Sequence, residues 1–239
     1  MIAAVDMLDA RSCRSVVERM VSSRCNWIDR SPHDDATFFT FGRASYLDVC
    51  PSDVDPQCAY YGKVSAANAE LKAIFGDLYA SLLDRLSAEL QDQVLMAEGL
   101  AIPGFHIFLG SGIMGAGKGG RHFDIQYERL RLPPGPIEGD PISFTLAIEL
   151  PTGGSGLDLW NVTVADFNRA FKAGRVATPD DMARRRIVAY HPYSVGRLLI
   201  HRGLWLHRIS SPGTIHADDR RITLQGHGLH IAGRWMLYW

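Results

Sequence analysis

The chain has 239 residues, a hydrophobic content of 46% and a formal net charge of -1. These values predict a packed globular core and exclude a general electrostatic attraction to nucleic acid or to an anionic membrane surface. No apolar run is long enough to cross a bilayer, and the first residues lack the basic and apolar regions of a secretory signal. We therefore expect a cytoplasmic protein whose partner is neither nucleic acid nor membrane.

The cysteines all lie in the first quarter of the chain, at Cys13, Cys25, Cys50 and Cys58. None of their spacings is Cys-x-x-Cys, which disfavours a zinc ribbon or a redox motif. Reduced and mostly buried thiols are the expectation for a cytosolic chain.

The first 99 residues are predicted to be mainly helical. Residues 1–30 have the mixed polarity of a helix, and residues 31–61 are irregular apart from an aromatic run at 37–42 that predicts a short strand. From residue 65 to residue 93, apolar side chains recur at three- and four-residue spacing, which is typical of an amphipathic helix. We expect this helix to pack on the face of a sheet.

After Gly99 the sequence becomes rich in strand patterns separated by Gly and Pro clusters. The predicted strands are residues 104–109, 121–132, 142–150, 156–162, 187–193, 196–201, 206–210, 221–230 and 234–239. Many short strands with turn signals favour a sandwich or jelly roll. Residues 163–186 interrupt them as a helical insertion, a natural place for a lid, with a Thr163/Asp166 capping box and Pro179 at a second helix start.

One short segment carries a candidate metal site. In a strand, residues two apart point to the same face, so His122 and Asp124 would present an imidazole and a carboxylate side by side. They supply two members of the 2-His-1-carboxylate triad that holds non-haem Fe(II). His207 is the favoured third ligand, in competition with His201, because Gly203 is expected to break the strand between them.

A basic residue should follow to hold an anionic cosubstrate, and Arg221 opens the last long strand. Arginine suits a carboxylate because its planar fork can donate two parallel hydrogen bonds. Thr223 shares the face of Arg221 by period-two spacing, as does His227, which is expected to support the site or core rather than act as a ligand. Arg220 is the competing candidate.

Residues 112–118 satisfy G-x-x-x-x-G-K, the pattern of a phosphate-binding loop. Gly119 replaces the Ser or Thr that would hold Mg²⁺, and a strand rather than a helix is predicted to follow. A glycine-rich loop beside the candidate metal site is the simpler interpretation.

From residue 103 to its end, the chain resembles the Fe(II)/2-oxoglutarate-dependent dioxygenases with a double-stranded β-helix core. The resemblance is carried by residues 122–124, 143–150 with Gly153 and Gly154, 196–200 ahead of His207, and 221–227. It implies an α+β, mostly β fold. Residues 1–239 would form a single domain, with 1–99 as helical N-terminal support. Residues 100–239 would be a jelly-roll or cupin-like double-stranded β-helix with the helical insertion 163–186.

The same resemblance implies that His122, Asp124 and His207 bind Fe(II), and that Arg221 and Thr223 bind 2-oxoglutarate as cosubstrate with O2. The implied activity is hydroxylation, or another oxidation, of an unactivated C–H bond in a small molecule, such as a free amino acid or a natural-product intermediate. Halogenases of this family have Gly or Ala in place of the carboxylate, so Asp124 argues against halogenation.

Alternative functions are a peptide or protein hydroxylase of the same family, a nucleotide-binding protein that uses Gly112 to Lys118, and a non-catalytic β-barrel. The oligomeric state stays open. Placement alone makes Phe39, Tyr127, Trp160 and Arg169 candidate substrate contacts.

Overall fold

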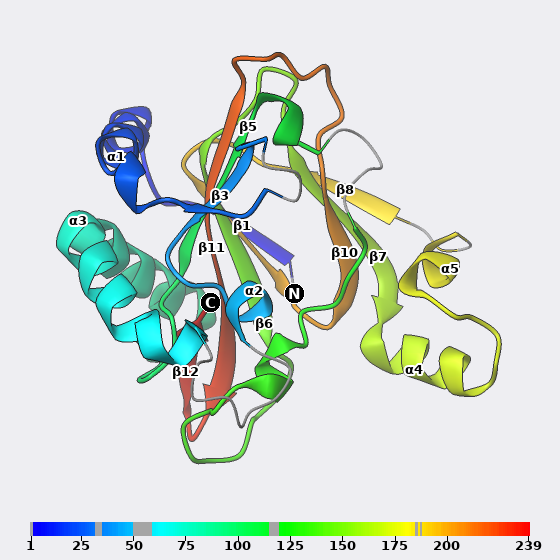
Figure 1. Cartoon of the computed structure of the whole chain (residues 1–239). Coiled ribbons are helices and arrows are strands. Elements are labelled where there is room, and N and C mark those ends of the chain that lie inside the picture. The colour runs from blue at the N-terminus through cyan, green and yellow to red at the C-terminus, as the bar shows by residue number, and fades with distance from the viewer. Residues whose placement is uncertain (1, 32–34, 50–58, 115–119, 185, 187) are drawn as a thin grey trace.

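A large and a small β-sheet form the centre of the computed structural model, which describes residues 2–31, 35–49, 59–114, 120–184, 186 and 188–239 (Figure 1). In chain order the elements are β1 (Ile2–Asp6), α1 (Ala10–Ser22), η1 (Arg24–Asn26), β2 (Ile28–Asp29), β3 (Phe38–Phe41), α2 (Ser45–Asp48), α3 (Ala59–Leu90), β4 (Val94–Met96), β5 (Gly104–Leu109), η2 (Gly110–Gly112), η3 (Gln126–Arg129), β6 (Ile142–Glu149), β7 (Gly156–Thr163), α4 (Val164–Lys172), α5 (Pro179–Ala183), β8 (Val188–Pro192), β9 (Arg197–Arg202), β10 (Trp205–Ser210), β11 (Arg220–Ile231) and β12 (Arg234–Tyr238).

The strand order of the two sheets is that of a double-stranded β-helix. The large sheet runs β1-β9-β6-β11-β5-β3-β2, with β12 and β4 joined to it through β11, and the small sheet runs β10-β7-β8. A bridge between His122 and His207 adds the 122–124 segment beside β10. From β5 onward the chain passes back and forth between the sheets, so the predicted jelly-roll winding is confirmed.

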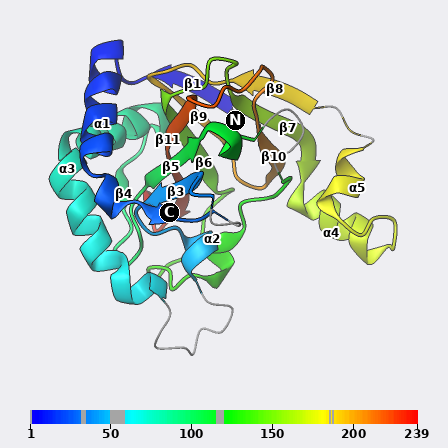
Figure 2. The ribbon, with the colours of Figure 1, turned by 45° about the horizontal axis from the view of Figure 1, so that its top comes forward.

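Burial on both faces explains the composition of the large sheet. In β6, every residue except the last is buried, as expected for a strand covered on both sides. On one side it faces α1 and α3, which lie together beside the sheet (Figures 1 and 2). On the other side, Ala147 and Leu199 of the large sheet share an apolar cluster with Leu157 and Leu159 of the small sheet.

Helix α3 packs as predicted. It spans Ala59–Leu90 rather than residues 65–93, and its non-helical backbone at Phe75 marks a kink. Leu71, Phe75, Leu82 and Leu86 have no exposed surface. These side chains join the large apolar cluster that includes residues of β5, β6 and β11, so the helix covers the outer face of the large sheet.

The prediction of a single helix over residues 1–30 was wrong at both ends. Residues 2–6 form β1, which pairs antiparallel with β9 at the sheet edge. The helix starts only at Ala10, because the side chain of Asp9 accepts a hydrogen bond from the N–H of Ser12 and caps it. Strands β2 and β4 were also missed, since each is too short to show a period.

The predicted strand over residues 121–132 was also wrong. Only His122 makes a ladder bridge, and Gln126–Arg129 forms a 3-10 turn. The reason is local: the N–H of Asp124 bonds the carbonyl of Gly203 at 2.9 Å, and the chain then turns, with the N–H of Ile125 bonding the carbonyl of Phe123 at 3.1 Å.

The insertion after β7 has the predicted caps. Thr163 with Asp166, and Thr178 with Asp181, form capping boxes at α4 and α5, and Pro179 opens α5. Its apolar side packs on Trp160, Val162 and Leu206. Leu206 alternates with His207 along β10, so these helices cover the outer face of the small sheet, on the right in Figure 1.

Cys13 is a buried free thiol and Cys25 an exposed one, while Cys50 and Cys58 lie outside the described residues. Among the helices that the structure describes, none combines the length and apolarity needed to cross a bilayer.

Candidate metal centre and adjoining cationic pocket

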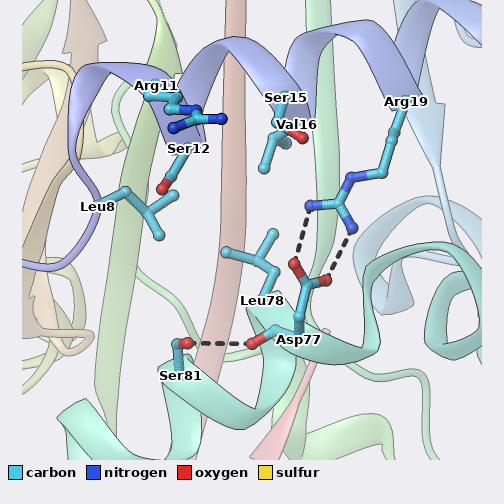
Figure 3. Close-up of a pocket in the computed structure, with 9 residues that line it drawn as sticks. All are labelled: Leu8, Arg11, Ser12, Ser15, Val16, Arg19, Asp77, Leu78 and Ser81. Atoms are coloured by element: carbon cyan, nitrogen blue, oxygen red, sulfur yellow. Dashed lines mark hydrogen bonds and ion pairs between the residues drawn. The ribbon is translucent and has the colours of Figure 1, made fainter.

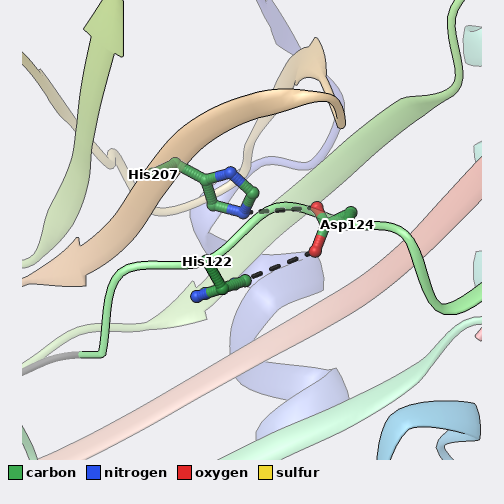
Figure 4. Close-up of side chains that lie close together, drawn as sticks. All are labelled: His122, Asp124 and His207. Atoms are coloured by element: carbon green, nitrogen blue, oxygen red, sulfur yellow. Dashed lines mark ion pairs between the residues drawn. The ribbon is translucent and has the colours of Figure 1, made fainter. Parts of the chain in front are cut away.

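Backbone pairing brings His122 and His207 face to face from distant parts of the chain. The N–H of His122 donates to the carbonyl of His207 at 3.0 Å, and the N–H of His207 donates back at 3.1 Å. The side chains of His122 and Asp124 point to the same side, toward His207 (Figure 4). The period-two expectation therefore gave the correct placement, although the segment is not a regular strand.

The three side chains form one compact group. Nε2 of His207 lies 3.2 Å from Oδ2 of Asp124, and Nε2 of His122 lies 3.8 Å from Oδ1. One ligand atom from each residue lies within 4.8 Å of the other two. Asp124 and His207 are buried, while half of the His122 side chain is exposed, so one side of the group is open to a ligand.

Backbone carbonyls fix the orientation of both imidazoles. Nδ1 of His207 lies 2.7 Å from the carbonyl of Trp205, and Nδ1 of His122 lies 3.0 Å from the carbonyl of Gly120. A carbonyl can only accept, so each neutral ring carries its proton on Nδ1 and leaves the Nε2 lone pair facing Asp124. This arrangement is the one that a histidine metal ligand needs.

The protonation states also suit a cation. Burial on its own would raise the pKa of Asp124, but His207 and His227 hold that pKa well below its usual value. Burial and the neighbouring His207 lower the pKa of His122. Burial on its own would lower the pKa of His207, but the charge of Asp124 and the hydrogen bonds to Asp124 and Trp205 together raise it, so a positive charge at this position is stabilised.

Two residues whose contacts with Asp124 the sequence did not predict hold this side chain in place. Ser143 on β6 donates a hydrogen bond from Oγ to Oδ2 of Asp124 at 2.5 Å. Gly203 allows close approach: a Cβ there would lie 2.9 Å from Oγ of Ser143 and 3.3 Å from Cβ of Asp124. A serine on a predicted strand carried no signal, since the fold alone brings it to the carboxylate.

Two further histidines, His201 and His227, lie next to this group. His201 packs its ring 4.6 Å from that of His207, and burial lowers the pKa of His201 to about 3. It falls outside the group of convergent ligand atoms formed by His122, Asp124 and His207. His227 lies beside the group, with Nδ1 3.0 Å from Oγ of Ser143 and 3.7 Å from Oδ2 of Asp124.

Arg221 is a buried cation whose terminal nitrogens are unpaired. Its side chain is 1% exposed, and Nε donates to Oγ of Ser155 at 3.2 Å. Neither Nη1 nor Nη2 has a hydrogen-bond partner among the described residues. The rings of Phe108 and Tyr193 lie 5.5 and 5.7 Å from its guanidinium carbon. A guanidinium left in this state is costly unless an anion completes it.

Arg220 differs sharply from its neighbour. It donates two hydrogen bonds to Oε1 of Glu149, at 2.8 and 3.1 Å, and its side chain is 38% exposed. Thr223 is fully buried two residues beyond Arg221, and its hydroxyl accepts a hydrogen bond from Gln225 at 3.3 Å. Of these two arginines, therefore, only Arg221 is buried and has terminal nitrogens without a partner among the described residues.

Two tyrosines, the buried Tyr193 and the half-exposed Tyr46, interact electrostatically with both the histidine–carboxylate group and Arg221. Burial raises the pKa of Tyr193, with Arg221 lowering it and Asp124 raising it. Burial likewise raises the pKa of Tyr46, whose hydroxyl bonds Nε2 of His106, and both Asp124 and Arg221 act on it. Because each phenol interacts with both charges, the histidine–carboxylate group and the guanidinium lie in the same region of the fold.

Of the four residues proposed from placement alone, Phe39, Trp160 and Arg169 lie in other parts of the fold. Phe39 belongs to the core beneath α3, and Trp160 lies under α4 and α5 between the guanidiniums of Arg121 and Arg208. Arg169 is an exposed partner of Asp166, and Tyr127 packs against the apolar cluster that contains Tyr238.

Of the phosphate-loop pattern, residues 115–119 lie outside the described residues. The described residues that follow, 120–124, form no helix, although that motif requires one to bind phosphate.

A cavity of about 310 Å³ lies elsewhere, between α1 and α3, where Arg19 pairs with Asp77 (Figure 3).

No family model matches the sequence, and no curated protein matches it. Solved structures do match its fold. An N-substituted L-amino acid dioxygenase from Burkholderia ambifaria AMMD, in complex with alpha-KG, superposes with a TM-score of 0.60 over 100% of this chain and 86% of that chain, at 13% identity. A second structure of that dioxygenase gives a TM-score of 0.57 with the same coverage and identity. With the strand order described above, this likeness shows that the chain has the double-stranded β-helix fold of that dioxygenase.

Proposed function

We propose that the chain is an Fe(II)- and 2-oxoglutarate-dependent oxygenase that hydroxylates, or otherwise oxidises, an unactivated C–H bond of a small molecule. The observation that carries this proposal is a convergent His-Asp-His group together with a buried arginine whose terminal nitrogens have no partner among the described residues. A free amino acid or a natural-product intermediate is the proposed substrate, and a cytoplasmic location is part of the proposal.

The donor set fits ferrous iron. Imidazole nitrogen and carboxylate oxygen are both good ligands for it, and three protein ligands on one face leave positions for other ligands. In this proposal His122 and His207 bind through Nε2, while Asp124 binds as an ionised carboxylate. Bound Fe(II) and 2-oxoglutarate would supply the oxidising chemistry, using O2 and releasing succinate and CO2.

Arg221 fits the distal carboxylate of 2-oxoglutarate. Its free Nη1 and Nη2 can donate two parallel hydrogen bonds to one carboxylate, and the hydroxyl of Thr223 lies two residues away on the same face of β11. The aromatic rings on either side exclude water, which strengthens that pairing. The alpha-KG bound by the B. ambifaria dioxygenase supports the assignment.

The name of that dioxygenase also supports an amino-acid-like substrate. Among the described residues, no observation favours the peptide alternative over a small molecule. The carboxylate of Asp124 occupies the position that a halide would need, so oxidation rather than halogenation is proposed.

Succinate formation tests the proposal. Purified protein, Fe(II), 2-oxoglutarate and a panel of free and N-acylated amino acids should give iron-dependent succinate that a panel member stimulates. Asp124→Ala and His207→Ala should abolish it and should also abolish Co(II) binding in a calorimetric titration. His216→Ala, an exposed histidine, is the matched control and should retain both. Succinate formation at the wild-type rate in the Asp124→Ala and His207→Ala variants would refute the ligand assignment.

A further inference from the structure

The face of β11 that presents Arg221 and Thr223 carries further polar side chains along the strand. Arg221, Thr223, Gln225 and His227 alternate along one face of the strand. His227 is the member closest to the carboxylate, with Nδ1 3.7 Å from Oδ2 of Asp124. Arg221 lies at the opposite end of this row, so a cosubstrate held by Arg221 would leave the His227 end free.

Proton counting assigns the His227 tautomer. Asp124 is a carboxylate and can only accept, so the single hydroxyl hydrogen of Ser143 is donated to it. Oγ of Ser143 must then accept from Nδ1–H of His227, 3.0 Å away. In a ring whose single proton is on Nδ1, Nε2 carries a lone pair. No hydrogen bond to this Nε2 is found among the described residues, and the side chain is 12% exposed.

A second incomplete group lies next to that ring. Tyr238 pairs with His227 across β11 and β12, and their rings lie 5.4 Å apart. Tyr238 is 1% exposed, yet its hydroxyl has no hydrogen-bond partner among the described residues. Burial and the nearby Asp124 carboxylate raise its pKa well above the usual value, so the hydroxyl keeps its proton and remains a donor.

We propose that His227 and Tyr238 form the polar subsite that orients the substrate beside Asp124. Nε2 of His227 receives an N–H or O–H of the substrate, and the hydroxyl of Tyr238 donates to an adjacent oxygen. The substrate class that fits presents a donor next to a carbonyl or carboxylate oxygen, as an amino acid, an N-acylated amino acid or a 2-hydroxy acid does. The assignment rests on the proposed oxygenase function and deepens it.

Buried polar groups are almost always hydrogen-bonded, so the unpartnered hydroxyl of Tyr238, with the free Nε2 of the partly buried His227 beside it, calls for a ligand. Their protein neighbours cannot complete them: Ser143 is used by Asp124, and Tyr60, the other tyrosine of this cluster with a buried hydroxyl, bonds the backbone of Ala101 and Trp239. A substrate that supplies both groups would be recognised in one orientation, which a site for C–H oxidation requires.

The first experiment separates binding from folding at Tyr238. Removing an unpaired buried hydroxyl should leave stability unchanged or higher, so Tyr238→Phe should not lower Tm. The matched control is Tyr79→Phe, whose buried hydroxyl donates to the carbonyl of Pro103 at 2.7 Å and whose loss should lower Tm. A fall in Tm for Tyr238→Phe equal to that of the control would mean that the hydroxyl serves a buried water only, and would overturn the proposal.

The second experiment uses two substitutions that split the functions of His227. His227→Asn keeps a side-chain N–H near Nδ1 for Ser143 but removes the acceptor, whereas His227→Gln keeps an acceptor near Nε2. The probes are L-amino acids, their N-acetyl and N-acetyl-N-methyl derivatives, and the corresponding 2-hydroxy acids. Binding of each probe is measured as the rise in Tm of protein loaded with Fe(II) and 2-oxoglutarate in the absence of O2. Turnover is measured as the KM for succinate release in the presence of O2.

We expect His227→Asn and Tyr238→Phe each to raise KM by roughly tenfold, about the value of one hydrogen bond, with 2-oxoglutarate binding retained. His227→Gln should lose less, and N-methylated probes should be insensitive to His227→Asn. Comparison of the amino-acid probes with the 2-hydroxy-acid probes shows whether an N–H or an O–H of the substrate donates to His227. Unchanged KM in both variants, or no protection of the wild-type protein by any probe, would overturn the subsite. Absence of iron-dependent 2-oxoglutarate binding in the wild type would instead refute the oxygenase function itself.

Discussion

The hydroxyl of Ser143 lies 2.5 Å from Oδ2 of Asp124 and donates a hydrogen bond to it across the barrel. Groups that hold a metal ligand in this way typically account for a 10–100-fold share of metal affinity. Ser143→Ala should therefore weaken Co(II) or Fe(II) binding by roughly 10–100-fold, while Ser155→Ala, which removes the hydrogen-bond partner of Arg221, should leave metal binding unchanged. Calorimetric titration of both variants measures this, and equal affinities would show that Ser143 has no such role.

Gly203 lies where the barrel has no room for a methyl group. A Cβ at this position would come within 2.9 Å of Oγ of Ser143 and 3.3 Å of Cβ of Asp124. Gly203→Ala should displace one of them, lowering the free energy of unfolding by about 1–3 kcal/mol and weakening metal binding further. Gly62→Ala in α3, where a Cβ meets nothing within 4 Å, should be neutral or stabilising by up to about 1 kcal/mol. Denaturant unfolding of the two variants compares them directly, and equal stability would contradict the crowding argument.

His230 gives the chain a predictable dependence on pH. Its two ring nitrogens each lie 2.8 Å from a carboxylate, Nε2 from Asp92 and Nδ1 from Glu138. Hydrogen bonding to Asp92 raises the pKa of His230, and His230 lowers the pKa of Asp92. A raised histidine pKa contributes stability that is complete below the unfolded value, near 6.5, and disappears as pH rises through the folded value. The lowered Asp92 pKa contributes stability that disappears as pH falls through the folded value.

The stability of the wild type should therefore exceed that of His230→Gln in weakly acidic solution, and the difference should shrink as pH rises above the folded pKa of His230. Thermal unfolding between about pH 5 and pH 9 measures this difference. His216→Gln, an exposed histidine away from these carboxylates, should show no comparable trend. A difference that grows with pH would contradict the assignment of the ion pairs.

Sequence reasoning placed the strands with strong patterns well, since β5 matches its predicted bounds and β6, β7, β10 and β11 lie within a residue of theirs. It failed where long-range pairing decides the structure. Residues 2–6 become a strand only because the edge of β9 is available. The segment after His122 is not a strand because its backbone leaves the edge of the small sheet at Asp124.

The site shows the same division. The alternation of His122 with Asp124, and of Arg221 with Thr223, was visible in the sequence because short-range spacing fixes which side chains share a face. Ser143, Gly203 and Tyr238 were not visible, because their roles depend on which strands become neighbours. Only the structure places Tyr238 beside His227 and Ser143 beside Asp124.

Arg221 is expected to lower the stability of the ligand-free protein and to be required for binding of 2-oxoglutarate. Its guanidinium is buried, and its terminal nitrogens have no partner among the described residues, so Arg221→Met should leave the ligand-free protein as stable as the wild type or more stable. The same variant should lose the rise in Tm that millimolar 2-oxoglutarate with Co(II) produces in the wild type, since that rise follows from binding to the folded state alone. Arg220→Gln, which removes only the half-exposed pair with Glu149, should change stability by less than about 1 kcal/mol and keep the full response to 2-oxoglutarate. If Arg221→Met lowered the stability of the ligand-free protein by several kcal/mol, the guanidinium would have an anionic partner within the protein, and its role as the cosubstrate anchor would fail.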